Sequence, residues 1–267
     1  MSSRKAASGP SPAYVLHRHD WSETSLIVEL FTRELGRVVV AAKGAKRPYS
    51  QLRPVLLPLQ RIAVQLGRTP PGDAEVHVLR TAEWAGGRPM PAGDALFAGF
   101  YLNELLLRML ARQDPHPELF DAYADTVDAL GQSEAGREAA LRAFEVVLLR
   151  ELGLMPELDG VTLTVEPLAP AGRYVIDAEA GVRPSRAGEA GVSGDVLAAV
   201  EAALGLPAGA GRGHRLREAV APAAAGLRPM LRTLVHYHLG SASLRTRDVV
   251  QGVRRLIDRP DGAPHSR

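Results

Sequence analysis

Cysteine is the first residue that the 267-residue sequence lacks, since it contains none. This absence excludes disulfides, thiolate nucleophiles, iron–sulfur clusters and cysteine-ligated zinc. Long hydrophobic runs are also missing, because no stretch approaches the roughly 20 apolar residues that a membrane-spanning helix needs. Residues 1–12 hold two cations but no apolar core of the kind that defines a secretory signal. We therefore expect a cytoplasmic protein with no membrane association.

Lysine is scarce, with only three residues, so arginine carries most of the positive charge. The net charge of +2 hides an uneven distribution: residues 1–80 carry +6, residues 81–160 carry −8 and residues 161–267 carry +4. Such segregation indicates separate surfaces for separate partners. The basic ends suit a polyanion, and guanidinium groups bind phosphate oxygens in pairs. A coding bias toward arginine is the alternative explanation of the arginine excess.

The first part of the chain has the pattern of β-strands. Runs rich in β-branched and aromatic residues, separated by turn residues, occupy residues 14–17, 25–32, 37–42, 58–66 and 75–83. Gly36 lies between the second and third runs and supplies the positive φ that a tight turn needs. Five short strands in this span predict a small closed barrel, for which the OB-fold is the commonest architecture. An SH3-like barrel is the competing prediction.

After residue 89 the hydrophobic period becomes helical. The pattern predicts helices over residues 94–111, 118–130, 134–152, 193–204, 212–239 and 246–257, the fifth of them kinked or split by Pro222 and Pro229. Asn103 and Glu104 interrupt the apolar face of the first helix. If they are buried, they must be fully hydrogen-bonded, and they then fix how this helix docks on its neighbours.

The predicted fold class is therefore α+β, with a five-stranded OB barrel followed by an α-helical domain. We expect a disordered tail at residues 1–12 and a nucleic-acid-binding barrel at residues 13–84. The helical domain follows in two segments, residues 90–158 and 193–258, with a small β or loop insertion between them at residues 159–192. Residues 259–267 form a frayed tail.

The segment AKGAKRPYSQLRP, residues 42–54, concentrates positive charge beside a predicted strand. Its cations and its one aromatic residue are Lys43, Lys46, Arg47, Arg53 and Tyr49. A cationic loop next to a small barrel can follow a phosphate backbone, and an interleaved aromatic ring can stack on a base. The alternative is an ordinary solvated surface loop.

No catalytic constellation is present in the sequence. It contains no P-loop, nucleophile elbow, HExxH motif or carboxylate pair of a known type. HRHD, residues 17–20, places His17 and His19 on one face of a strand, but it offers no clear third ligand. A surface strand pair is the better interpretation. We predict no catalytic residue, no metal and no cofactor.

Four segments together carry a family pattern. They are WSETSLIVELFTRELGRVVVAAKGAKR, YLNELL, LRAFEVVLLRELGLMPEL and LGSASLRTRDVV, at residues 21–47, 101–106, 141–158 and 239–250. In this order, and spanning nearly the whole chain, they resemble the RecO family of bacterial recombination mediators. The resemblance implies a non-enzymatic, nucleoid-associated protein that binds single- and double-stranded DNA and anneals complementary strands. Its implied protein partners are RecR and the acidic tail of single-stranded DNA-binding protein (SSB), with which it helps load RecA.

The resemblance also implies where partners bind. The basic OB surface of the family falls on the cations of residues 42–54, with Arg37, on the strand leading into that loop, as a further candidate. The family's pocket for the SSB tail lies in the helical domain. Here Arg142 and Phe144, in the matched LRAFE segment, are the candidates for it.

One departure from the family pattern concerns zinc. Many members carry a four-cysteine zinc site after the GLMPEL-like segment. In this sequence Val161 and Thr164 stand roughly where the first cysteine pair would begin. Without thiolates a zinc ribbon cannot form. We expect residues 159–186 to form a small metal-free β-lobe or a partly ordered loop.

Two other functional classes remain open at this point. A protein-only adaptor would use the barrel to bind a partner and no nucleic acid, because one fold supports many functions. A small nuclease is disfavoured, because the sequence lacks an acidic metal-binding cluster. Retention on single-stranded DNA separates the mediator from the adaptor.

Overall fold

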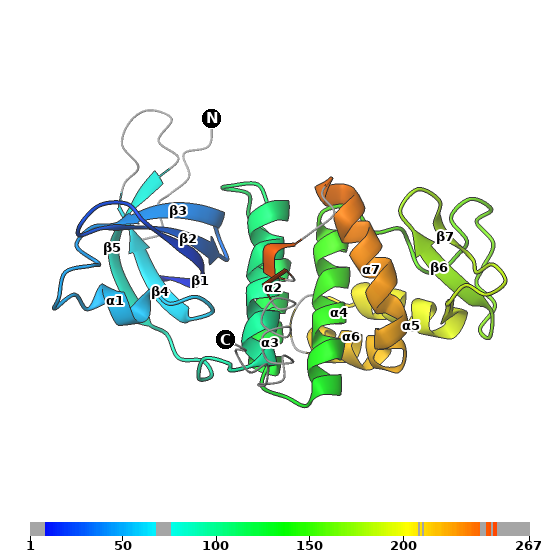
Figure 1. The fold of residues 1–267 in the computed structure, drawn as a ribbon. Helices are drawn as coiled ribbons and strands as arrows, with labels where there is room; N and C mark the ends of the chain where they lie inside the picture. Colours follow the sequence, from blue (N-terminus) through cyan, green and yellow to red (C-terminus); the bar gives the residue numbers. More distant parts are fainter. Residues whose placement is uncertain are drawn as a thin grey trace, which may run out of the picture.

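The computed structural model describes residues 9–67, 76–207, 209, 211–240, 244–246 and 248–249. In Figure 1 a barrel, a helical layer and a small sheet follow one another in a row. The predicted C-terminal tail, residues 259–267, lies outside the described residues. So do most of the predicted N-terminal tail, residues 1–12, and most of the last predicted helix, residues 246–257. Among the described residues, no helix is long and apolar enough to cross a membrane.

The barrel consists of five strands joined in the closed order β1-β2-β3-β5-β4. Their bounds are β1 Ser11–Asp20, β2 Leu26–Thr32, β3 Gly36–Ala42, β4 Arg61–Leu66 and β5 Val76–Trp84, and a short helix, α1 Leu52–Val55, lies between β3 and β4. The β3–β5 pair is parallel and the others are antiparallel. This arrangement confirms the OB-like barrel predicted from the sequence.

The predicted N-terminal tail is too long. Ser11 and Pro12 already belong to β1, where they pair with Val64 and Ala63 of β4. Proline is tolerated near the start of a strand because its missing N–H need not join the ladder there. The sequence pattern missed this pairing because its partner strand lies some 50 residues away.

The barrel and the helices share a core. Along β2 nearly every side chain is buried, because the two faces pack against different neighbours. Val28 and Leu30 lie inside the barrel, whereas Phe31 packs with Tyr14 of β1 against the helical domain. The rings of Phe31 and Phe120 have centroids 5.4 Å apart. This second apolar face attaches the barrel to the helices.

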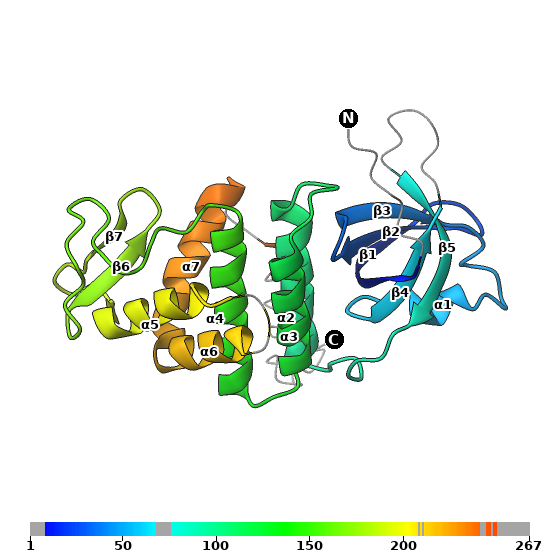
Figure 2. The same cartoon turned by 180° about the vertical axis from the view of Figure 1, so that it is seen from behind.

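The helical domain is built around α4, which lies between the α2–α3 pair on the barrel side and α6 and α7 on the other (Figures 1 and 2). Its helices are α2 Asp94–Met109, α3 Pro117–Ala129, α4 Glu134–Glu151, α5 Gly194–Leu204, α6 Arg212–Val220 and α7 Ala224–Leu239. A short 3₁₀ turn, Ala221–Ala223, contains Pro222 and separates α6 from α7. Pro229 lies inside α7 without ending it.

Asn103 on α2 connects the helical domain to the barrel. Its side chain is buried, and Nδ2 donates to the carbonyl oxygen of Leu16 over 2.8 Å. The hydroxyl of Tyr123, on α3, donates in turn to Oδ1 of Asn103. The amide is thus bonded on both sides, as the sequence required of a buried Asn103.

Glu104, the next residue, holds a different part of the chain. Its carboxylate accepts the backbone N–H groups of Arg245 and Thr246, each over 2.8 Å, and the Thr246 hydroxyl over 2.7 Å. Burial alone raises the pKa of Glu104, but these hydrogen bonds outweigh burial and lower it. Two adjacent residues of α2 therefore dock two distant segments.

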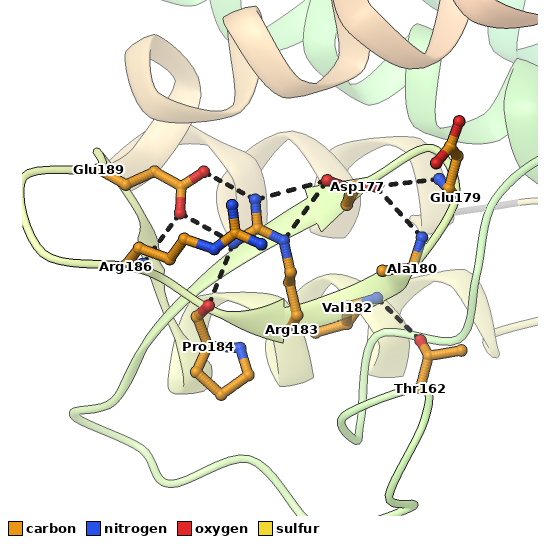
Figure 3. A network of polar contacts seen from close by, with 9 residues as sticks. All are labelled: Thr162, Asp177, Glu179, Ala180, Val182, Arg183, Pro184, Arg186 and Glu189. Atoms are coloured by element: carbon orange, nitrogen blue, oxygen red, sulfur yellow. Dashed lines mark hydrogen bonds and ion pairs between the residues drawn. The ribbon is translucent and has the colours of Figure 1, made fainter.

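Residues 159–193 contain a small three-stranded sheet of order β7-β6-β8, with β6 Arg173–Asp177, β7 Gly181–Pro184 and β8 Val192–Ser193. Figure 3 shows Arg183 of β7 between two acidic side chains. Its guanidinium lies 2.8 Å from both carboxylate oxygens of Glu189 and 3.4 Å from Oδ2 of Asp177. The Arg183 guanidinium and the Arg186 N–H lower the pKa of Glu189 to about 2. We call this arrangement the Arg183 clasp.

Candidate nucleic-acid interface

The cationic loop follows β3 and is oriented by one buried methyl group. Ala45 is fully buried in the barrel core, and its N–H donates to the carbonyl oxygen of Ala42. Gly44, with a φ of 74°, accepts the N–H of Arg47 and completes the turn. Because Ala45 points inward, the flanking side chains of Lys43 and Arg47 are exposed.

Lys46 joins this loop to the β1–β2 turn. Its Nζ lies 3.2 Å from Oδ2 of Asp20 and donates to the carbonyl oxygen of Ser22 over 3.1 Å. Its backbone N–H donates to Thr24 over 2.9 Å. An exposed pair of this kind contributes about 0–1 kcal/mol. Lys46 therefore acts mainly as a link between two loops, with its charge partly neutralised.

The remaining predicted side chains of the loop are free to meet a ligand. Lys43, Arg47 and Arg53 are exposed, and no carboxylate in the described part of the chain pairs with any of them. The Tyr49 side chain is 94% exposed. The structure thus brings three unneutralised cations and one open ring onto the same loop and the helix that follows it. We call Lys43, Arg47, Tyr49 and Arg53 the loop cluster.

Arg37 does not belong to this cluster, which corrects the sequence prediction. It lies at the opposite end of β3, where its side chain is only 15% exposed and pairs with Glu29 at 3.5 Å. Arg112 binds the same carboxylate at 3.0 Å. Burial lowers the pKa of Arg37. Arg37 is therefore part of the contact between the barrel and the helical domain. The local sequence could not show that Arg112, which follows α2, shares the Glu29 carboxylate with it.

Sequence reasoning missed Trp21. It lies in the β1–β2 turn, immediately before the Ser22 carbonyl that Lys46 binds, and its side chain is 59% exposed. The signal was present, since a large aromatic residue in a polar turn between two strands has no core to fill. His17 and His19 stack edge to face at 4.3 Å on the same strand, as the surface-pair interpretation expected.

A second site is a cavity of about 330 Å³ between α2, α4 and α7. Its apolar wall is formed by Phe97, Tyr101, Leu141, Val235 and Leu244. Its polar lining consists of Arg137, Arg142, Arg228, Arg232, Asp94, Glu134, Glu138 and His236. An apolar floor with several arginines around it has the chemistry to receive a short acidic peptide with apolar side chains.

Arg142 and Phe144 occupy different surroundings. Arg142 lines the cavity but is buried, and Nη2 lies 2.6 Å from Oε1 of Glu145, which also accepts the Tyr101 hydroxyl. Burial raises the pKa of Glu145 more than Arg142 lowers it. Phe144 is 1% exposed and packs on Tyr123 in the core. Its ring does not line the cavity, so the sequence prediction for Phe144 is wrong, because the neighbouring helix that buries it was unknown.

Comparison with known proteins decides the family. The model described as "Recombination protein O N terminal" matches residues 10–87, and the one described as "Recombination protein O C terminal" matches residues 90–248. The chain belongs to the RecO family. Family membership places it among proteins of DNA repair and recombination, as the sequence resemblance implied.

Individual RecO proteins are similar over nearly their full length. The chain is 50% identical to "DNA repair protein RecO" of Acidovorax ebreus over 264 residues, which covers 96% of this chain and 100% of the relative. It is 51% identical to "DNA repair protein RecO" of Variovorax paradoxus over 256 residues, which covers 92% of this chain and 96% of the relative.

Among the residues that the structure describes, no group of three or more acidic, histidine or cysteine side chains could hold a metal ion.

Proposed function

We propose that this chain is a non-catalytic recombination mediator that binds single- and double-stranded DNA through the loop cluster and promotes annealing of complementary strands. The observation that carries the proposal is the set of exposed, unpaired cations beside an open tyrosine on an OB-like barrel. Cations that neutralise phosphates lower the repulsion between two strands, and base pairing then supplies specificity. The proposal includes RecR as a partner and the loading of RecA as the outcome, because the chain belongs to the RecO family.

The cavity between α2, α4 and α7 supports the second part of the proposal, binding of the acidic SSB tail. Arg228 and Arg232 are exposed at its edge, and apolar side chains form its floor. Positive groups attract the tail and orient it, while apolar contacts hold it. In this proposal the tail lies beside Arg142, the residue that the sequence singled out, with Leu141 rather than Phe144 as its neighbour on α4.

The test is a salt series of DNA binding. Lys43→Glu with Arg47→Glu is compared with Arg173→Glu and Arg215→Glu, which changes the net charge equally at exposed sites far from the barrel. We expect weaker binding of both single- and double-stranded DNA for the first pair of changes only. Equal affinities of the two variants would reject the site, and no retention of the wild-type protein on DNA would favour the protein-only adaptor.

A further inference from the structure

We propose that Trp21 stacks on an unpaired base and makes the barrel select single strands over duplex. The inference rests on the proposed DNA-binding function and deepens it, because it assigns the two forms of DNA to different side chains. The cations of the loop cluster, Lys43, Arg47 and Arg53, meet phosphates, which both forms possess. Trp21 meets the face of a base, which only an open strand offers.

The geometry holds the Trp21 indole at the surface. The turn is short and internally bonded, since the N–H of Trp21 donates to the Ser25 carbonyl oxygen over 3.3 Å and the Ser25 N–H donates to Oγ of Ser22 over 3.1 Å. The indole is 59% exposed, although burying an aromatic ring is favourable. A ring kept at the surface by an ordered turn loses little conformational freedom when it stacks.

The turn is physically joined to the loop cluster. Lys46 bonds Ser22 through its side chain and Thr24 through its backbone, so the two loops lie side by side. Arg47 follows Lys46 directly, and Trp21 precedes Ser22. A strand whose phosphates follow the cations of the loop therefore passes the turn, within reach of the indole. His17 and His19 present two further exposed rings just before it in the sequence.

Charge and stacking together explain the predicted selectivity. Stacking of a base on an aromatic side chain tolerates any sequence, because every base has a π-face. In a duplex those faces are covered by neighbouring pairs. Trp21 thus adds affinity only for open strands, whereas Lys43 and Arg47 add affinity for both.

The chain contains two tryptophans, Trp21 and Trp84, which permits a direct experiment. Trp84, at the end of β5 and 63% exposed, is the matched control. Trp84→Phe leaves Trp21 as the single tryptophan, and Trp21→Phe leaves Trp84, so excitation at wavelengths that tyrosine does not absorb reports on one indole at a time. On titration with unlabelled oligothymidylate we expect quenching of the Trp21 emission and little change in that of Trp84. Bound DNA without quenching of Trp21 would overturn the inference.

Affinities complete the test. We expect Trp21→Ala to weaken oligothymidylate binding by about fivefold or more. Duplex binding by the same variant, and both affinities of Trp84→Ala, should change by less than about twofold. Equal losses on single strands and duplex would reject the stacking role while leaving the proposed function intact. Absence of any DNA binding by the wild-type protein would reject the proposed function itself.

Discussion

The hydroxyl of Tyr123 lies 2.5 Å from Oδ1 of Asn103 and fixes the orientation of that amide, whose other end holds the backbone of β1. The relationship spans three elements: α3 orients a side chain of α2, and that side chain donates a hydrogen bond to the backbone of β1 in the barrel. Both side chains are buried, so water is not available to replace a lost bond.

Tyr123→Phe removes the donor and keeps the ring. We expect the free energy of unfolding to fall by about 1–3 kcal/mol, because Oδ1 of Asn103 is left without a partner. Denaturant unfolding measures the change. Tyr237→Phe is the control, since that side chain is 53% exposed and its loss should cost less than about 0.5 kcal/mol. Similar unfolding curves for the two variants would contradict the role given to this bond.

Glu104→Gln should destabilise the protein in a pH-dependent manner. The pKa of Glu104 is lowered from 4.5 in the folded protein, so its charge contributes stability at neutral pH that is lost as the pH falls through the lowered value. At neutral pH we expect the free energy of unfolding of Glu104→Gln to be about 1 kcal/mol lower than that of the unchanged protein. Thermal unfolding of the variant and the unchanged protein, from neutral pH down to below 4.5, measures whether this difference in stability disappears as the pH falls. Glu179→Gln, at an exposed site, serves as the control. A deficit independent of pH would show that the carboxylate charge is not involved.

Salt dependence should report the number of phosphate contacts made by the loop cluster. For single strands the slope of log affinity against log salt changes by about 0.7 for each phosphate contact. Lys43→Glu with Arg47→Glu should therefore flatten the slope by about 1.4. Fluorescence anisotropy of a labelled oligonucleotide over a range of salt concentrations gives the slope. An unchanged slope with reduced affinity would mean that these cations act indirectly.

Binding of the SSB tail should depend on the exposed arginines of the cavity. Arg228→Glu with Arg232→Glu should weaken binding of an acidic tail peptide by about tenfold or more. Calorimetry with the peptide measures the loss, and Arg173→Glu with Arg215→Glu provides the same change of net charge elsewhere. Arg142→Ala is a poor test, because it leaves Glu145 buried without its cation, at a cost of about 3–5 kcal/mol in stability. Unchanged peptide binding would place the tail on another surface.

The elements of this fold were predictable where their signals are local. Runs rich in β-branched and aromatic residues, with Gly36 at one of the turns between them, predicted the barrel strands. Gly36 has a φ of 68°, and a Cβ there would collide with the carbonyl of Asp114. The positive φ was foreseeable from the turn, whereas the collision was not, because Asp114 lies in the helical domain.

The site residues were predictable to a different extent. Lys43, Arg47 and Tyr49 are exposed as the loop composition suggested. Arg37 and Phe144 were misassigned, since a residue's neighbours across the fold decide whether it faces solvent. Local sequence contains hydrophobic period and turn chemistry, but it does not state which distant carboxylate or ring will cover a given side chain.

The Arg183 clasp has a consequence for the conditions under which the small sheet keeps its shape. Its bonds join a guanidinium to two carboxylates, and the chain contains no thiol. Strong acid, which discharges Asp177 and Glu189, is therefore expected to loosen the clasp. The shape of this small sheet should then depend on the charge of two side chains that lie more than 170 residues from the start of the chain.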